Sequence, residues 1–162
     1  MTEEKIKNPF VEEEGYRCFG CAPEEMNPYG LNMEFTKEGD EIVSLWEPKD
    51  HFQGFKNVLH GGIQAALIDE IASWVVFVHC ETGGFTAGLN VRYLKNVLTD
   101  KGPVTLKARL KEMVKNRAFV EVSLIDGTGN VCTEAVAEYF TLPSYIAEKK
   151  LHYPGKDAFR YE

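Results

Sequence analysis

His60-Gly61-Gly62-Ile63-Gln64-Ala65-Ala66-Leu67-Ile68-Asp69-Glu70 is the stretch that decides the fold of this 162-residue chain. Its His-Gly-Gly turn opens a long apolar helix that we expect to run from about residue 61 to about residue 79. Two acids lie inside this helix, where a charge is costly to bury, and this indicates chemistry or a specific partner. The glycine-opened helix start offers free backbone N–H groups and the positive end of the helix dipole. The segment therefore combines an oxyanion or anion site with a candidate base or nucleophile.

The segments on either side of this helix have the patterns of strands. Residues 31–35 and 42–46 alternate in polarity around the turn Lys37-Glu38-Gly39-Asp40, which predicts a hairpin. After the helix, further strands are expected over residues 85–93, 104–113, 118–125 and 131–142. One buried helix and about six antiparallel strands predict an α+β fold, with the sheet wrapped around a single central helix. Because one helix cannot cover so many strands, we expect a dimer with a shared sheet.

Length and composition indicate one globular domain, expected over residues 18–142. A charged lead-in over residues 1–17 precedes it, and a polar tail over residues 143–162 is expected on the surface or on a partner. The net charge of −7 argues against nucleic acid and anionic membranes as partners. The most apolar run, residues 63–78, is interrupted by Asp69, Glu70 and Ser73 and is not expected to span a membrane. Since the N-terminus has no apolar signal core, a cytoplasmic protein is the expectation.

The four cysteines include one close pair, Cys18-Phe19-Gly20-Cys21. Such a C-x-x-C pair is read as half of a zinc site, as a redox pair, or as part of a structured loop with reduced, half-buried thiols. Cys80 and Cys132 are isolated, so the sequence offers no second pair to complete a zinc site. The third interpretation is favoured, and we expect neither a metal nor a cofactor.

The sequence resembles the hotdog-fold acyl-CoA thioesterases, especially the phenylacetate-pathway-like group. The resemblance rests on the His-Gly-Gly turn with Asp69 seven positions after Gly62, on the lead-in over residues 52–59, and on the strand Thr86-Ala87-Gly88-Leu89-Asn90-Val91-Arg92-Tyr93-Leu94. It covers residues 18–142. The implied function is hydrolysis of acyl-CoA to free acid and CoA, without a cofactor.

The resemblance also implies roles for individual residues. The N–H of Gly61 or Gly62 would polarise the thioester carbonyl, Asp69 would act as general base or nucleophile, and Thr86 would position water. Some members carry Asn or Gln six positions before the motif histidine, where this chain has Gly54. Gln53 and Asn57 are the candidates to replace that contact.

The spacing within the helix predicts a site shared between two chains. Asp69 lies seven residues beyond Gly62, which is about 10 Å along a helix axis. A reacting carbonyl needs its oxygen about 3 Å from the N–H donors and its carbon about 3 to 3.5 Å from the attacking atom. One protomer cannot satisfy both requirements, but two antiparallel helices would place Gly62 of one against Asp69 of the other. We expect a homodimer or a dimer of dimers with composite sites.

Helical periodicity separates the two acids. Asp69 shares a stripe with small residues, which leave room for a ligand or a partner backbone, whereas Glu70 lies nearer bulky residues. Asp69 is therefore preferred over Glu70 as the catalytic acid, although either could instead form an interhelical hydrogen bond or a salt bridge. His60 could act as a base, but its place at the helix start favours a role in holding the turn.

Binding residues are less well defined by the sequence. The CoA phosphates favour Arg or Lys at strand ends and turns, and the candidates are Arg92, Lys95, Lys115 and Arg117. Asn90, in the same strand as Arg92, is a further substrate-binding candidate. The acyl pocket could use Phe52, Phe55, Trp74 or Phe77, although core packing is the preferred interpretation for the last two.

Two other functions remain open. A hotdog dehydratase or hydratase acting on acyl thioesters has some support from Asp50-His51-Phe52, a His-Phe pair that precedes the active helix in acyl-carrier dehydratases. A non-catalytic acyl-CoA binding module would keep the groove and lose hydrolysis. The joint presence of the acid and the His-Gly-Gly turn favours the hydrolase.

Overall fold

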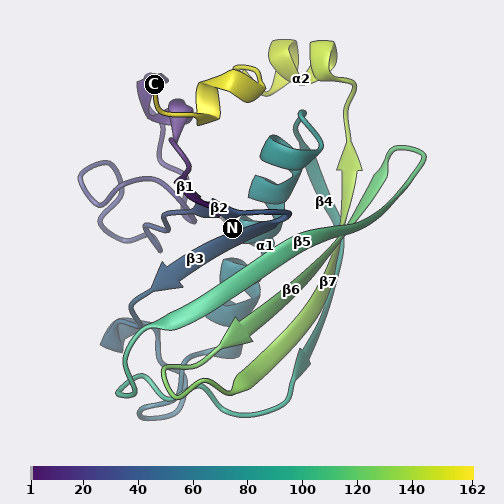
Figure 1. Cartoon of the computed structure of the whole chain (residues 1–162). Coiled ribbons are helices and arrows are strands. Elements are labelled where there is room, and N and C mark those ends of the chain that lie inside the picture. Colours follow the sequence, from purple (N-terminus) through teal and green to yellow (C-terminus); the bar gives the residue numbers. More distant parts are fainter. Residues whose placement is uncertain (1) are drawn as a thin grey trace.

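Helix α1 (Gly61–His79) lies against a curved, seven-stranded antiparallel sheet that wraps around it (Figure 1). The structure is a computed structural model that describes residues 2–162. The helix contacts the five strands β3, β4, β5, β6 and β7. This is the predicted hotdog arrangement, and the helix has the predicted limits. His60 begins it as the N-cap, and Cys80 ends it.

The sheet has the strand order β1-β2-β3-β5-β6-β7-β4, so β4 forms one edge. Every pairing is antiparallel. The strands are β1 (Glu3–Lys5), β2 (Thr36–Glu38), β3 (Glu41–Trp46), β4 (Gly84–Tyr93), β5 (Val104–Val114), β6 (Arg117–Ile125) and β7 (Val131–Thr141). The four strands expected after the helix are confirmed, because the period-2 pattern marks them clearly.

The predicted hairpin before the helix is displaced along the chain. Residues 31–35 are not a strand, and β2 begins only at Thr36. Leu31 and Met33 donate their backbone N–H groups to the carbonyls of Phe19 and Gly20 instead. The alternation in this segment is real, since Leu31, Met33 and Phe35 are buried. The N-terminal loop, however, takes the hydrogen bonds that a neighbouring strand would have made.

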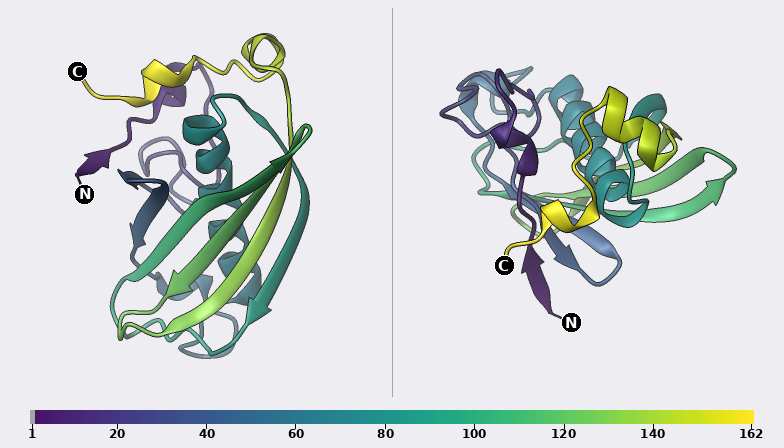
Figure 2. Two further views of the ribbon diagram at one scale, coloured as in Figure 1. Left: turned by 45° about the vertical axis from the view of Figure 1, so that its right-hand side comes forward. Right: turned by 90° about the horizontal axis from the view of Figure 1, so that it is seen from above.

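Both ends of the chain pack on the domain (Figure 2). β1 pairs with β2, and the short helices η1 (Pro9–Glu12), α2 (Ser144–Lys150) and η3 (Lys156–Phe159) lie near the C-terminal end of α1. Most residues of the C-terminal tail are exposed or half-buried, but the tail also buries Tyr153 and Phe159. Tyr153 donates a hydrogen bond to the carbonyl of Phe77, and the rings of Phe159 and Phe77 stack. The tail therefore helps to close the core.

The inner face of the sheet and α1 form the core. In β5, buried Val104, Leu106 and Ala108 alternate with more exposed residues, as predicted for a sheet with one wet face. By length and composition alone, helix α1 is apolar enough to cross a membrane, despite its two acids. Its contacts with five strands make it the core helix of a globular domain.

Candidate active site

The start of α1 forms the first half of the site. Nδ1 of His60 accepts a hydrogen bond of 2.9 Å from the N–H of Gly62. His60 thus holds the turn, as its position predicted, and it occupies one of the two N–H groups considered for an oxyanion. The N–H of Gly61 has no acceptor within residues 2–162, so it is the better oxyanion donor of the two.

Asp69 forms the second half of the site with two hydroxyl groups from the sheet. The Thr86 hydroxyl, on β4, donates to Oδ1 of Asp69 at 2.8 Å. The Tyr139 hydroxyl, on β7, lies 2.5 Å from the same Oδ1 and 2.6 Å from the backbone carbonyl of Asp69. Within residues 2–162 no donor binds Oδ2. The carboxylate is therefore held by one oxygen, and the other is left for a water molecule or a substrate.

Tyr139 is the site residue that sequence reasoning missed. Burial, followed by the nearby Asp69 charge, raises the pKa of Tyr139, so its hydroxyl stays protonated and remains a donor. A signal was present in the sequence: Tyr139 follows Ala135 and Ala137 on the inward-facing positions of β7. One polar aromatic side chain in a row of small buried residues points at the helix.

The structure keeps the two halves apart within one protomer. Gly61 and Gly62 lie at the N-terminus of α1, and Asp69 lies two helical turns away, about 10 Å along the axis. Near the first half, Tyr93 donates a hydrogen bond of 2.7 Å to the carbonyl of Gly61. The separation between the helix start and Asp69 that motivates a site shared between two chains is thus present in the structure.

Both side chains proposed to replace the missing amide at Gly54 use their amide oxygen within the loop before α1. A Cβ at Gly54 would lie 3.4 Å from the His60 ring, so this position does lie next to the motif. Gln53 uses its Oε1 to accept from the N–H of Asn57 at 2.6 Å. Asn57 has a positive φ of 65°, and its Oδ1 accepts from Thr99. Both side chains stabilise the loop before α1.

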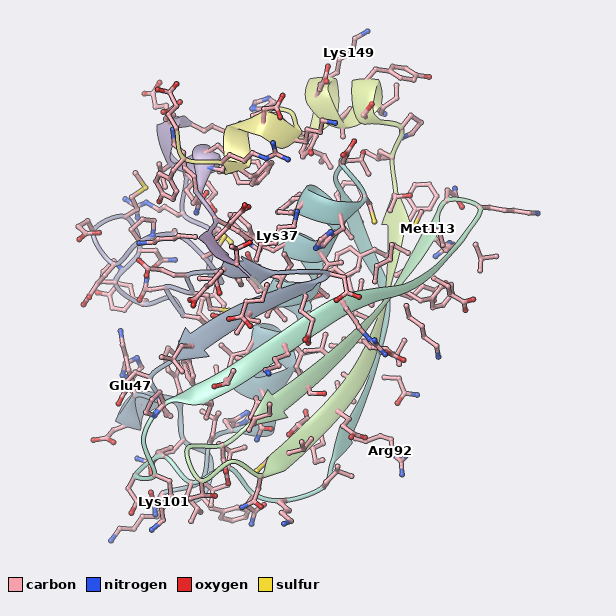
Figure 3. The ribbon with its side chains drawn as sticks, in the orientation of Figure 1. Lys37, Glu47, Arg92, Lys101, Met113 and Lys149 are labelled. Atoms are coloured by element: carbon pink, nitrogen blue, oxygen red, sulfur yellow. The ribbon has the colours of Figure 1, made fainter. Side chains whose placement is uncertain are left out.

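Three predicted substrate contacts lie on the outer face of the sheet, away from Asp69. Arg92 is exposed at the β4 edge, where its side chain points outward (Figure 3). Together with Asn90 it lines a shallow hollow whose other residues lie on β6 and β7. Arg117 makes an ion pair with Glu138 and lies over the ring of Phe140. The structure does not bring these three residues to Asp69 of the same chain.

A β-bulge in β4 explains why Asn90 and Arg92 face away from Asp69. β4 and β7 shift register between Thr86 and Gly88, so one residue of β4 has no partner. Without the bulge, Thr86, Asn90 and Arg92 would share a face, because strand side chains alternate. With it, Thr86 faces the helix, whereas Asn90 and Arg92 face outward.

The aromatic candidates for an acyl pocket divide between core and surface. Trp74 and Phe52 are buried, and Phe77 packs against Phe10 and Phe159, so these three belong to the core. Phe55 is 86% exposed in the loop before α1. Among the four, only Phe55 is free to contact a ligand without repacking the protein.

Glu70 points to the other flank of α1, toward the N-terminal loop. Its Oε1 accepts a hydrogen bond from the indole of Trp74 at 3.2 Å and lies 3.4 Å from Sγ of Cys18. Burial, and then the charge of Cys18, raises the pKa of Glu70 to about 8. A hydrogen bond from the Cys21 thiol is the main cause that lowers the pKa of Cys18 to about 5. Glu70 is thus not part of the Asp69 site.

Comparison with known proteins supports this architecture. The profile of the thioesterase superfamily matches residues 56–133, which include the helix start, Asp69 and β4. A candidate esterase of Thermoplasma acidophilum is 26% identical over 119 residues, which are 71% of this chain and 89% of that protein.

Solved structures show the same fold. A thioesterase superfamily protein aligns with a TM-score of 0.65 at 21% identity, over 71% of this chain. The aligned part spans just over half of that protein, 56% of its length. A hypothetical thioesterase of Streptococcus pneumoniae, solved with coenzyme A, aligns with a TM-score of 0.64 at 22% identity, over 70% of this chain and 88% of the other. At these identities the likeness establishes the hotdog fold.

Proposed function

We propose that this protein, which has the hotdog fold of the thioesterase superfamily, hydrolyses acyl-CoA thioesters to a free acid and CoA. The observation that carries the proposal is the Asp69 carboxylate, held by Thr86 and Tyr139 through one oxygen while the other is free. The solved relative from S. pneumoniae that contains coenzyme A supports CoA as the thiol part of the substrate.

The free oxygen of Asp69 fits the task of a general base. It takes a proton from a water molecule while the water oxygen attacks the thioester carbon. The N–H of Gly61 and the positive end of α1 stabilise the charge that develops on the carbonyl oxygen. The C–S bond then breaks, and the CoA thiolate leaves and recovers the proton from Asp69. The same geometry allows Asp69 to attack the carbon directly, with water hydrolysing the anhydride in a second step.

A homodimer completes this site in the proposal, because one protomer holds its two halves too far apart. Strand β4 forms an open edge of the sheet and carries Phe85, Leu89 and Tyr93 as exposed apolar residues. Pairing two β4 edges would continue the sheet across two chains and bring their helices together. A dimer of dimers would bury the same pair of helices.

Substitution of Leu89 tests the dimer. Leu89→Lys places a charge on the β4 edge and is expected to weaken the dimer, so that the protein dissociates into inactive monomers on dilution. Leu45→Lys, at a more exposed position on β3, is the matched control and should leave the dimer intact. Light scattering after gel filtration measures the mass. A wild-type protein that is monomeric and fully active would contradict the composite site.

The proposed thioesterase group and cellular location are based on the sequence. We place the protein with the phenylacetate-pathway-like thioesterases because of the spacing between Gly62 and Asp69, and we propose a cytoplasmic location. The dehydratase alternative gains no support: His51 packs against the ring of Phe52 in η2 (Asp50–Phe52), and Phe52 is buried.

Release of free thiol from a panel of aryl and alkyl acyl-CoA esters tests the function. We expect turnover that depends on Asp69 and requires no added metal. CoA esters that bind without thiol release would overturn the hydrolase in favour of a binding module. A panel in which only simple oxygen esters are cleaved would overturn CoA as the substrate class.

A further inference from the structure

The Cys18-Phe19-Gly20-Cys21 turn and Glu70 converge on the flank of α1 that the proposed hydrolysis does not use. The two Sγ atoms are 3.2 Å apart, and Sγ of Cys18 is 3.4 Å from Oε1 of Glu70. The three donor atoms all lie within 4.8 Å of one another. We propose that Cys18, Cys21 and Glu70 bind one Zn²⁺ ion or a divalent ion of the same borderline-soft class.

The donor spacing is close to that of a tetrahedral zinc site. Zinc bonds of about 2.3 Å to sulfur and about 2.0 to 2.2 Å to oxygen place neighbouring donors about 3.3 to 3.8 Å apart. The two separations made by Sγ of Cys18, 3.2 Å to Sγ of Cys21 and 3.4 Å to Oε1 of Glu70, therefore need shifts of about half an ångström. Sγ of Cys21 and the Glu70 carboxylate, which lie within 4.8 Å of each other, would draw together around the ion. Two thiolates with one carboxylate suit zinc, whereas calcium and magnesium prefer oxygen donors alone. A fourth position remains for water or for the Tyr16 hydroxyl, which lies 2.9 Å from Sγ of Cys21.

The surroundings are shaped to bring the carboxylate to the thiols. A Cβ at Gly20 would lie 2.4 Å from the side chain of Glu70, so only glycine lets this acid approach the turn. The backbone N–H of Cys21 points at Sγ of Cys18 at 3.4 Å, and the indole of Trp74 fixes Oε1 of Glu70. Such outer contacts orient metal ligands and tune their affinity.

The cluster lies beside a cavity that opens to solvent. An open cavity of about 500 Å³ lies between the N-terminal arm and residues 32–35, and Cys21 and Trp74 are among its lining residues. A bound ion would tie the N-terminal loop to α1 at the residue next to Asp69. The inference does not depend on the proposed hydrolysis, because its donors are distinct from the residues assigned to that reaction.

Cobalt binding to the full-length, reduced and metal-stripped protein tests the site. Co²⁺ reports tetrahedral coordination by its visible d–d bands and thiolate ligation by a near-ultraviolet charge-transfer band. We expect saturation at one ion per chain and displacement of Co²⁺ by Zn²⁺. Cys18→Ser and Cys21→Ser should each lose the charge-transfer intensity of one thiolate, whereas Cys80→Ser and Cys132→Ser should bind as the wild type does.

Two further variants separate this site from a simple thiol pair. Glu70→Gln removes the carboxylate, and Gly20→Ala removes no donor but pushes the carboxylate away. Both are expected to weaken binding about 10- to 100-fold. Unchanged affinity in both would exclude Glu70 and overturn the three-ligand site. If the reduced protein binds no cobalt, while Cys18 and Cys21 form a disulfide in air, the cluster is a redox pair and the metal site is wrong.

Discussion

The two flanks of helix α1 use neighbouring acids in opposite ways. Asp69 faces β4 and β7, accepts hydrogen bonds from two hydroxyl groups, and keeps one oxygen free. Glu70 faces the N-terminal loop, where sulfur atoms and an indole N–H surround its carboxylate. One step of about 100° around the helix separates a carboxylate held by two hydroxyl groups from one placed among thiols. The surroundings of each acid, more than its position in the sequence, decide what it can do.

Replacing each acid by its amide is the most direct test of the difference between the two flanks. Asp69→Asn should lower kcat by about 10²- to 10⁴-fold, because an amide cannot accept the proton of water. Glu70→Gln should change kcat by less than about tenfold, because its side chain points away from the site. Thiol release measures both variants, with melting temperatures to confirm folding. Equal losses in the two variants would show that the flanks are not independent.

Gly61→Pro removes the N–H assigned to the oxyanion while keeping the helix. Proline is tolerated at the first helical position, and His60 already has the extended backbone that precedes proline, with φ −58° and ψ 134°. The loss expected for one oxyanion donor is about 10²- to 10³-fold in kcat. Mixing Gly61→Pro with Asp69→Asn chains should restore activity, because a heterodimer regains one intact composite site. Failure of mixed, exchanged dimers to regain activity would place both halves in one chain.

Thr86→Val tests the hydroxyl that positions Asp69. Valine has the shape of threonine without the hydroxyl, so one hydrogen bond to the carboxylate is lost, at a cost of about 1.5 to 3 kcal/mol. We expect kcat to fall about 10- to 100-fold with little change in KM. Thr86→Ser keeps the hydroxyl and should recover most of the activity. A loss in Thr86→Ser as large as in Thr86→Val would mean that the methyl group, through packing, is what matters.

Asp126, in the turn between β6 and β7, provides a third carboxylate, with the smallest expected effect. Its Oδ1 accepts hydrogen bonds from Thr128 and Asn130, and the Thr128 hydroxyl is the main cause that lowers the pKa of Asp126 to about 2. A lowered pKa stabilises the fold above the ordinary value near 3.8, and this stability is lost as the pH falls through 2.

Because Asp126 is only partly buried, solvent screens its charge, and its contribution is below about 1 kcal/mol, or about 2 to 4 °C in Tm. Asp126→Asn should therefore melt slightly below the wild type at pH 7, and the two should converge near pH 2, with activity unchanged. A difference in Tm that stays constant over this range would exclude the charge as its cause.

The regular elements were predictable because their patterns are local. Alternation marked β5, β6 and β7, and the His-Gly-Gly turn marked the start of α1. The segment over residues 31–35 misled the prediction because its alternating residues are buried against the N-terminal loop, so its hydrogen-bond partner is far away in the sequence. Alternation along the chain indicates which residues are buried, but it does not identify the segment that they hydrogen-bond or pack against.

The candidate site residues that lie on the helix were predictable from the sequence, whereas the arrangement of those on the sheet was not. Gly61, His60 and Asp69 follow from the helix, and Thr86 from the family resemblance. Asn90 and Arg92 were assigned to the site together with Thr86, but one unpaired residue in β4 turns them to the opposite face. Tyr139 was missed because it lies 70 residues from the acid that it contacts.

The sequence by itself determined the central helix, the strands after it and the placement of Asp69 and Glu70 on different flanks of that helix, because helical and strand periodicities are properties of neighbouring residues. Only the tertiary structure decided which groups surround each acid. It brought Tyr139 to Asp69, and it brought Glu70 to two cysteines about 50 residues away, because those contacts depend on sheet register and loop packing. The C-x-x-C pair lacked a partner in the sequence and acquired one, Glu70, only when the chain folded.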